Sequence, residues 1–321
     1  MPGTLMSQRL INYTGRPKPS NALKLPVLVS YEYLRKMRQE DRDWLLTKSK
    51  RFGWELLLDS GGFSALNSGS VISVEEYTEF LKTYEKSFFR YFALDVIGNA
   101  EGTVKNQEYM LNAGLNPIPI HILGHGQEEM DSHFGISSLV GCGGLRRPHR
   151  GAAPLNYLHQ KMKWANGRDV HWLGRVRIDE IVSLKPFSVD CSDWTQGQVW
   201  GLLGFYVGRG KWVRTRRKDR HKFAINPKMQ RIIDIAGFKR EDFYKDESWY
   251  RDKEKQGSGD NFFSLMCNAV SWIDFSMETR RKVGTRVFLA STMIPQDLVG
   301  LQEAWKRWKA HRKRMEIARV A

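Results

Sequence analysis

The sequence is poor in cysteine, in acidic side chains and in long apolar stretches. Its three cysteines, Cys142, Cys191 and Cys267, form no CxC or CxxC pair, which argues against a structural zinc site and against a disulfide framework. No apolar run reaches the roughly 18 residues of a membrane-spanning helix, and the N-terminus lacks the apolar segment of a signal peptide. We therefore expect a cytoplasmic protein with reduced thiols, no metal, no cofactor and no membrane partner.

The deficit of acidic residues leaves the chain strongly basic. Lys and Arg number 51 against 35 Asp and Glu, which gives a formal net charge of +16. Such an imbalance bears on partners rather than on fold, and it is typical of proteins that hold a polyphosphate backbone. An enzyme that acts on a small metabolite rarely needs it. A basic surface without a bound partner is the alternative.

Short apolar runs that end in Gly, Asp or His alternate with helical stretches over most of the first 200 residues. Near-continuous apolar strands separated by helices predict a parallel sheet covered by helices, and eight such units fit a (β/α)8 TIM-like barrel. A doubly wound open sheet is the alternative. The predicted strands span residues 10–14, 25–30, 54–59, 91–96, 117–123, 137–143, 169–174 and 187–191.

Three helices are predicted between these strands. The first covers residues 31–46. Ser73 and Glu76 form an S-x-x-E capping box, which predicts the start of a second helix at this point. A third helix covers residues 101–113 and ends at Gly114, a residue type that favours the left-handed conformation that closes helices.

The strand and helix alternation stops near residue 204. We therefore predict a barrel domain over residues 1–204 and a basic C-terminal appendage over residues 205–321. Within the appendage, residues 251–260 have the composition of a loop. Residues 303–319 predict a basic terminal helix, which Trp305 and Trp308 are expected to pack onto the barrel.

Residues 204–223 carry eight Lys or Arg against one Asp, with Phe205, Tyr206 and Trp212 between them. Basic residues interleaved with aromatic ones are typical of nucleic-acid binding, because the cations neutralise phosphates and the rings stack on bases. A solvated basic surface is the alternative. The predicted phosphate-binding residues are Arg209, Lys211, Arg214, Arg216, Arg217, Lys218 and Arg220.

Carboxylates stand at the ends of three predicted strands: Asp59, Asp95 and Asp190. In a (β/α)8 barrel the active residues lie at the C-terminal ends of the strands, so the three are expected near one mouth. A single Asp at such a position is more often a turn or capping residue. Two carboxylates in one pocket suit displacement at a sugar carbon, with one as nucleophile and one as acid/base.

Five motifs resemble the tRNA-guanine transglycosylase superfamily in order and spacing over residues 10–200. The most specific are "DSGGF" (59–63) and "VDC" (189–191). The others are "ALDV" (93–96), "GCGGL" (141–145) and "VHWLG" (170–174). The resemblance implies a (β/α)8 barrel and a pentosyltransferase that exchanges guanine in a polynucleotide for a 7-deazaguanine base.

The resemblance also implies roles for individual residues. Asp190 matches the nucleophile that forms a covalent glycosyl-enzyme, and Asp59 matches the general acid/base. Asp95 matches the carboxylate that reads the N1/N2 edge of guanine. The residues matched to the base-binding walls, backbone and stacking face are Phe63, Gly143, Gly144 and Leu173, and His121 is placed nearby. A core histidine is an equal alternative for His121.

Two departures from the tRNA enzymes narrow the substrate. The closely spaced cysteines and histidine of their zinc site are missing, and the C-terminal part resembles none of them. A short, zinc-free relative is similar to the DpdA-type DNA transglycosylases, in particular the bacteriophage-encoded kind, which would act in the host cytoplasm.

The resemblance therefore implies DNA and a free, preQ0-like 7-deazaguanine base as partners. Three alternatives stay open: a zinc-free tRNA-guanine transglycosylase, a non-catalytic nucleic-acid-binding subunit that keeps the barrel, and a sugar-cleaving hydrolase. A non-catalytic subunit would be expected to lose Asp59 or Asp190, and both are present. The oligomeric state is left open.

Overall fold

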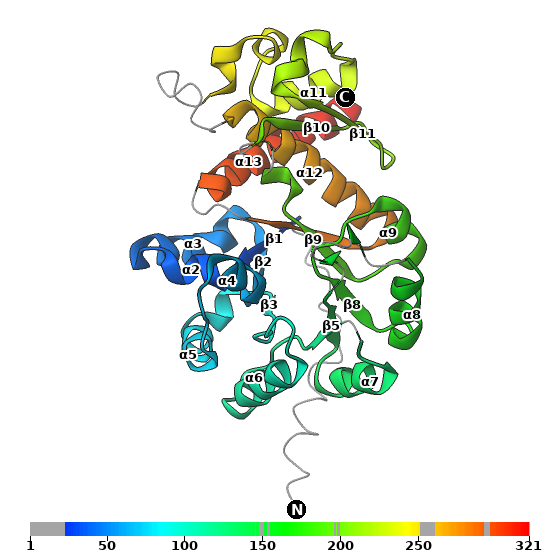
Figure 1. The fold of residues 1–321 in the computed structure, drawn as a ribbon. Helices are drawn as coiled ribbons and strands as arrows, with labels where there is room; N and C mark the ends of the chain where they lie inside the picture. Colours follow the sequence, from blue (N-terminus) through cyan, green and yellow to red (C-terminus); the bar gives the residue numbers. More distant parts are fainter. Residues whose placement is uncertain are drawn as a thin grey trace, which may run out of the picture. The chain divides into compact units, whose positions relative to one another are not determined.

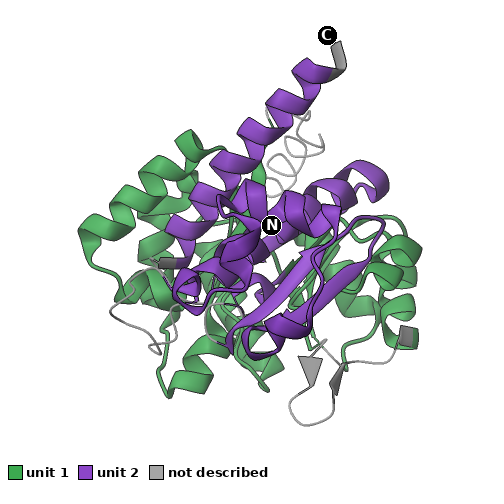
Figure 2. Ribbon diagram, turned by 90° about the horizontal axis from the view of Figure 1, so that it is seen from above, with its two compact units in different colours: residues 1–190 green, residues 191–321 purple. Residues whose placement is uncertain are grey.

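A computed structural model of the chain describes residues 23–122, 124–144, 146–147, 151–152, 155–195, 197, 200–250, 261–291 and 296–320. The chain divides into two compact units, residues 1–190 and residues 191–321 (Figure 2). The predicted boundary at residue 204 falls 14 residues later, because the structure assigns residues 191–204 to the second unit. The predicted strand at 10–14 and the predicted loop at 251–260 lie outside the described residues.

An eight-stranded curled sheet dominates the fold, with the order β3-β2-β1-β12-β9-β8-β5-β4. The pairs β1–β2, β2–β3, β4–β5, β5–β8 and β8–β9 are all parallel. A parallel bridge between Phe92 and Ile118, with Ala93 N donating to Ile118 O at 2.9 Å, joins the chain beyond β3 to the chain before β4. Helices lie outside the strands of the first unit (Figure 1). This α/β arrangement is consistent with the predicted TIM-like barrel.

The strands of the sheet, in chain order, are β1 (Leu25–Ser30), β2 (Trp54–Asp59), β3 (Arg90–Tyr91), β4 (Ile120–His121), β5 (Leu139–Cys142), β8 (Asp169–Trp172), β9 (Ser188–Cys191) and β12 (Arg286–Ala290). The helices of the first unit are α2 (Tyr31–Lys36), α3 (Gln39–Phe52), α4 (Gly62–Ser68), α5 (Val74–Tyr84), η1 (Glu85–Ser87), α6 (Ala100–Asn112), α7 (Gln127–Ile136), α8 (Leu155–Ala165) and α9 (Ile178–Leu184). A short two-stranded sheet pairs β6 (Arg146–Arg147) with β7 (Gly151–Ala152).

The eighth strand of the sheet differs from the sequence prediction. It is β12, which comes from residues that the prediction assigned to the appendage. The segment "RVFLA" is apolar and buried over four of its five residues, as a central strand requires. The C-terminal part of the chain is therefore more than an appendage, because it supplies one strand of the main sheet.

Local sequence signals explain some of the helix boundaries in the first unit. Ser73 Oγ accepts a hydrogen bond from Glu76 N at 3.1 Å, so the predicted cap starts α5. The predicted helix over residues 31–46 is two helices, because Met37 and Arg38 are extended. Glu40 and Asp41 then occupy the first turn of α3, where negative charge is favourable.

The second unit is built around α12 (Phe262–Val283), in which 15 of the 22 residues are buried. An antiparallel hairpin, β10 (Leu202–Tyr206) and β11 (Trp212–Arg216), packs on it through aromatic pairs such as Trp212 with Trp272, whose ring centroids are 4.6 Å apart. The other helices of this unit are η2 (Asp193–Thr195), η3 (Arg217–Lys222), α11 (Pro227–Ala236), η4 (Arg240–Phe243), η5 (Asp246–Trp249) and α13 (Gln296–Val320). Among the described helices, none combines the length and apolarity needed to cross a membrane.

Candidate active site

The turn after β2 explains the sequence "DSGGF". Asp59 ends the strand, and its Oδ2 accepts a hydrogen bond from Gly61 N at 3.0 Å. Gly61 has φ +84°, and a Cβ at this position would lie 2.7 Å from Glu32 Cβ and 2.8 Å from Glu32 N. Both the conformation and the space therefore require glycine. The result is a fixed carboxyl group at the C-terminal end of a buried strand.

The same turn brings Asp95 to Asp59. Ser60 Oγ donates to Asp95 Oδ1 at 2.6 Å. A Cβ on Gly62 would lie 2.6 Å from Asp95 O and 2.7 Å from Asp95 Oδ1, so only glycine lets the turn approach this residue. Gly61 thus leaves room for Glu32, and Gly62 leaves room for Asp95.

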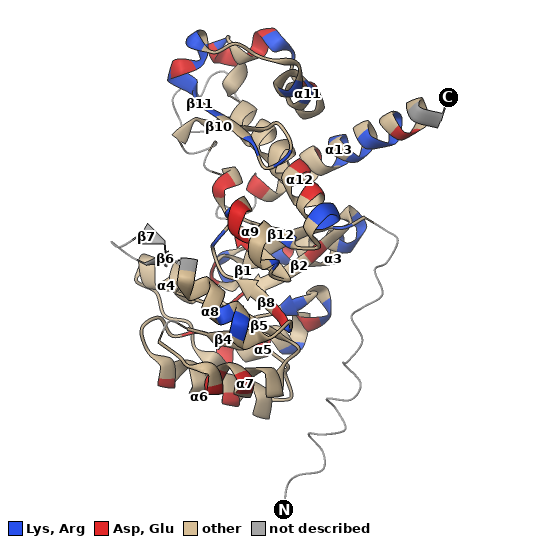
Figure 3. Cartoon of the chain, turned by 90° about the vertical axis from the view of Figure 1, so that its right-hand side faces the viewer, with Lys and Arg blue, Asp and Glu red and all other residues tan. Residues whose placement is uncertain are grey.

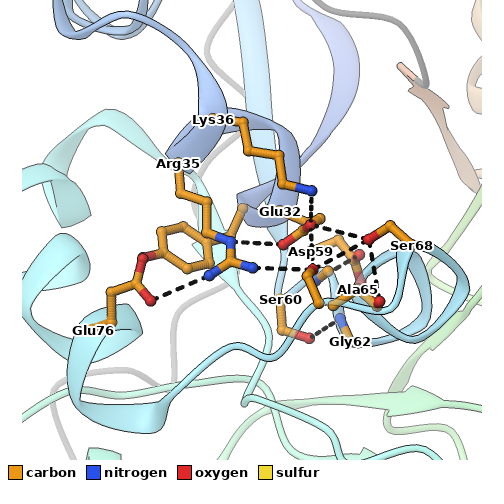
Figure 4. A network of polar contacts seen from close by, with 12 residues as sticks. Glu32, Arg35, Lys36, Asp59, Ser60, Gly62, Ala65, Ser68 and Glu76 are labelled. Carbon is orange, nitrogen blue, oxygen red and sulfur yellow. Dashed lines mark hydrogen bonds and ion pairs between the residues drawn. The ribbon is translucent and has the colours of Figure 1, made fainter.

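A polar network supports the turn from behind (Figure 4). Glu32 is buried and accepts hydrogen bonds from Arg35 Nε at 2.7 Å and from Ser70 Oγ at 2.6 Å, and it also pairs with Lys36. Burial alone would raise its pKa, but the hydrogen bonds from Lys36, Ser70 and Arg35 prevail and lower the pKa of Glu32 to about 2. Glu32 is therefore ionised at neutral pH, and its charge anchors the loop that follows α4.

Asp190, on β9, is held by two donors. Its Oδ1 accepts from Gly174 N at 2.8 Å and lies 3.0 Å from His171 Nε2. His171 Nδ1 lies 2.8 Å from Ser188 Oγ. His171 and Ser188 are completely buried, whereas Asp190 keeps 8 % of its surface exposed. Two donors on one oxygen hold the carboxyl group in one orientation, which suits a group that must meet a substrate atom.

Asp59 responds to the other two carboxyl groups. Burial raises its pKa to about 7, and the negative charges of Asp95 and Asp190 act in the same direction. Burial also raises the pKa of Asp95, although the hydrogen bond from Ser60 opposes it. A carboxylic acid that is half protonated near neutral pH can both give and take a proton. The structure thus brings the three strand-end aspartates together, as the sequence predicts.

Four of the predicted base-binding residues follow β2, β5 and β8: Phe63, Gly143, Gly144 and Leu173. A Cβ on Gly143 would lie 3.2 Å from Ile120 Cγ2 and 3.9 Å from Leu173 Cδ1, so Leu173 lies close to the glycine backbone. Gly144 is exposed and left-handed, with φ +70°. Phe63, in the first turn of α4, is 56 % exposed, which is high for an aromatic ring and leaves its face available for stacking.

His121 lies in the core of the first unit. Its Nε2 bonds to Gly126 O at 2.9 Å, and its Nδ1 accepts from Lys161 Nζ at 2.6 Å. Lys161 is itself fully buried and also donates to His125 O at 3.1 Å. Burial lowers the pKa of His121 to about 4, so the ring is neutral at physiological pH. Both nitrogens are engaged by protein atoms, which fits the core alternative for this residue better than base binding.

The predicted phosphate-binding residues fall into two groups. The exposed residues are Arg209, Lys211, Arg214, Arg216 and Lys218. Arg220 is buried, donates to Tyr244 O at 3.2 Å and pairs with Asp246 at 2.9 Å. Arg217 is half-buried, with its guanidinium 4.9 Å from the Tyr250 ring centroid. These two hold η3 in place, and the first group is the part available to a ligand.

The exposed group has a defined geometry. Lys211 N donates to Gly208 O at 3.1 Å around Arg209 and Gly210, which have φ +54° and +73°. Two positive φ values in a two-residue loop define a type I′ turn, which suits the twist of a hairpin. Arg209 and Lys211 therefore lie at the hairpin tip, and the exposed residues Arg214 and Arg216 lie on β11.

The tryptophans of the terminal helix are buried, and the hydrogen-bond partner of Trp308 lies on α12 of the second unit, whereas the sequence predicted packing onto the barrel. Trp305 and Trp308 stack with ring centroids 5.2 Å apart, and Trp308 Nε1 donates to Asp274 Oδ1 on α12 at 2.5 Å. The side chains of residues 309–318 are mostly exposed, and four of these residues are Lys or Arg (Figure 3). The helix is thus anchored at its centre and presents cations beyond the anchor.

The described residues contain no cluster of three or more His, Cys, Asp or Glu side chains that could hold a metal ion. Sequence reasoning missed Ser60, His171 and Ser188. The available signal for the last two was a polar residue within each of two apolar strands, "DVHW" and "SVDC".

No family model, curated protein or solved structure significantly matches the chain. The chemistry of the site is therefore inferred from its residues. Ser188, His171 and Asp190 include the residue types of a serine-hydrolase triad, but the hydroxyl is at the completely buried end and the carboxylate is at the exposed end. A triad presents the hydroxyl to its substrate. Here the group that keeps some solvent exposure is the carboxylate of Asp190, at 8 %.

Proposed function

We propose that the protein is a DNA-guanine transglycosylase, which replaces guanine in DNA with a preQ0-like 7-deazaguanine base through a covalent glycosyl-aspartate. The observation that carries the proposal is the difference between the environments of two carboxyl groups, Asp190 and Asp59. Asp190 has two hydrogen-bond donors on one oxygen, whereas the pKa of Asp59 is raised to about 7. One group suits a nucleophile and the other a proton donor, as a double displacement at a sugar carbon requires.

In the first half-reaction, a target guanosine flipped out of the helix, or already single-stranded, enters the pocket. Asp190 attacks C1′ while the bond from C1′ to guanine N9 breaks. The protonated Asp59 supplies the proton that the leaving guanine needs. A glycosyl ester to Asp190 and a free guanine are the products.

In the second half-reaction, the incoming 7-deazaguanine loses its N9 proton to Asp59. The resulting nitrogen attacks C1′, and Asp190 leaves as a carboxylate. Two inversions retain the configuration at C1′. Asp59 is then protonated again, so the cycle closes without any external acid or base.

Base selection is assigned to the residues around the three aspartates. Ser60 Oγ donates to Asp95 Oδ1, and each carboxyl oxygen can accept more than one hydrogen bond, so the group can also accept from the N1–H and exocyclic amine of a guanine-like edge. The backbone of Gly143 and Gly144 lies close to the base in this scheme, and Phe63 and Leu173 pack against its two faces.

DNA is favoured over tRNA as the polymer because the sequence lacks the closely spaced zinc ligands typical of the tRNA enzymes. The exposed basic hairpin suits the phosphate backbone of either polymer. A zinc-free tRNA transglycosylase would use the same aspartates on another polymer.

The experiment that tests the chemistry is capture of the covalent intermediate. Wild-type protein mixed with guanine-containing DNA, without an incoming base, should form a denaturation-resistant DNA adduct. Asp190→Ala should form none, because the attacking oxygen is missing. An adduct formed equally by Asp190→Ala would contradict the assignment of Asp190 as the nucleophile. If the wild-type protein formed no adduct and released no guanine, the protein would not be a covalent transglycosylase.

A further inference from the structure

We propose that His171 is a positioning residue for the nucleophile, held in turn by Ser188, and that this chain selects the Oδ2 atom of Asp190 as the attacking oxygen. The inference rests on the proposed function and deepens it. Neither residue touches the substrate in this scheme, because both are completely buried.

Strand register places the three side chains together. His171 on β8 lies directly opposite Ser188 on β9 in the parallel ladder. Asp190 follows Ser188 by two residues, so both side chains project from the same side of the strand. The distances along this chain are 2.8 Å from Ser188 Oγ to His171 Nδ1 and 3.0 Å from His171 Nε2 to Asp190 Oδ1.

The hydrogen bonds fix both the tautomer and the carboxylate. A neutral imidazole that donates from Nε2 must accept at Nδ1, and the Ser188 hydroxyl is placed to donate there. The Nε2–H then points at Asp190 Oδ1, which also receives Gly174 N–H at 2.8 Å. Two donors on Oδ1 fix the rotation of the carboxylate, so Oδ2 is the oxygen left to attack C1′.

The ring of His171 has little freedom to take another orientation. Its centroid lies 5.1 Å from that of Phe92 across the interior of the first unit. A buried, packed imidazole keeps its orientation at low entropic cost, which is what a positioning group requires. A solvent-exposed histidine would lose this advantage.

Two variants of His171 distinguish loss of the hydrogen bond to Asp190 from loss of the buried imidazole ring. In His171→Gln the amide nitrogen falls near the position of Nε2, so the donor to Asp190 is kept. In His171→Asn the shorter amide reaches the position of Nδ1, so the hydrogen bond with Ser188 is kept while Asp190 has one donor fewer. Single-turnover formation of the DNA adduct should slow about 10²-fold in His171→Asn, with the KM for DNA unchanged, and His171→Gln should restore most of the rate.

Ser188→Ala provides an independent measurement if the His171 variants fold poorly. It should slow adduct formation in the wild-type background and have no further effect in the His171→Gln background, because Ser188 acts only through the imidazole. His133→Asn, which removes another buried imidazole on α7, is the matched control and should leave the rate unchanged.

Two outcomes overturn the inference. Equal rates for His171→Asn and wild type would do so, as would equal reductions in rate for His171→Asn and His171→Gln at equal thermal stability. Failure of the proposed function looks different, because the wild-type protein itself would then form no adduct and exchange no base.

Discussion

The environment of Asp59 predicts how the rates of the two half-reactions depend on pH. With its pKa raised to about 7, it is mainly protonated at pH 6 and mainly ionised at pH 8. Guanine release needs the acid form, so its rate should fall as pH rises through about 7. Attack by the incoming base needs the ionised form, so that half-reaction should accelerate over the same range. Single-turnover rates of the two half-reactions, measured from pH 5 to pH 9, check this opposition.

Asp59→Asn is the control for the pH profile. It cannot exchange a proton, so both half-reactions should slow by about 10²–10⁴-fold and lose the inflection near neutral pH. DNA affinity should change little, because the amide keeps the acceptor for Gly61 N–H. An inflection near pH 7 that persists in Asp59→Asn would assign it to another group.

The turn between β2 and α4 has no room for a side chain at Gly62. Gly62→Ala would place a methyl group 2.6 Å from Asp95 O, a backbone atom that cannot rotate away. We expect a decrease of about 1–3 kcal/mol in folding stability from the overpacking and a larger decrease in base binding, because Asp95 must move. Thermal unfolding and the KM for the incoming base measure the two effects. Gly69→Ala, at the open end of α4, is strained but meets no atom within 4 Å and should affect stability alone.

Sequence patterns predicted the elements whose signals are local. The apolar run "LPVLVS" is a fully buried strand, and Ser73 caps its helix as expected. β12 was missed because a short apolar segment after a 22-residue helix carries no mark of the distant strand beside which it lies. The pairing of His171 with Ser188 was missed because the register of parallel strands is set by packing and not by a short turn.

The basic hairpin predicts how the affinity of the protein for DNA depends on charge and salt. We expect the exposed cations of β11, its turn and the start of η3 to bind the DNA backbone. Changing Lys211, Arg214, Arg216 and Lys218 to Gln should weaken duplex binding and lower the salt slope by about 0.9 for each phosphate that is no longer neutralised. Titrations of DNA binding at several salt concentrations measure both quantities. The chemistry on a bound guanine should be preserved.

Charge elsewhere on the same unit provides the control. Lys228, Lys239 and Lys245 are exposed and lie outside the hairpin, so changing all three to Gln removes a similar charge. This variant should affect binding much less. Equal effects of the two sets would indicate a diffuse basic surface, the alternative left open by the sequence.

Base exchange on two polymers is the measurement that tests the central claim most directly. Purified protein would be incubated with isotopically labelled guanine or a 7-deazaguanine and with either DNA or tRNA at matched salt, and the digested nucleosides analysed by mass spectrometry. We predict the label in DNA, with none when Asp190 is changed to Ala. Incorporation into tRNA alone would contradict the assignment of the polymer, and incorporation into neither would contradict the proposed exchange.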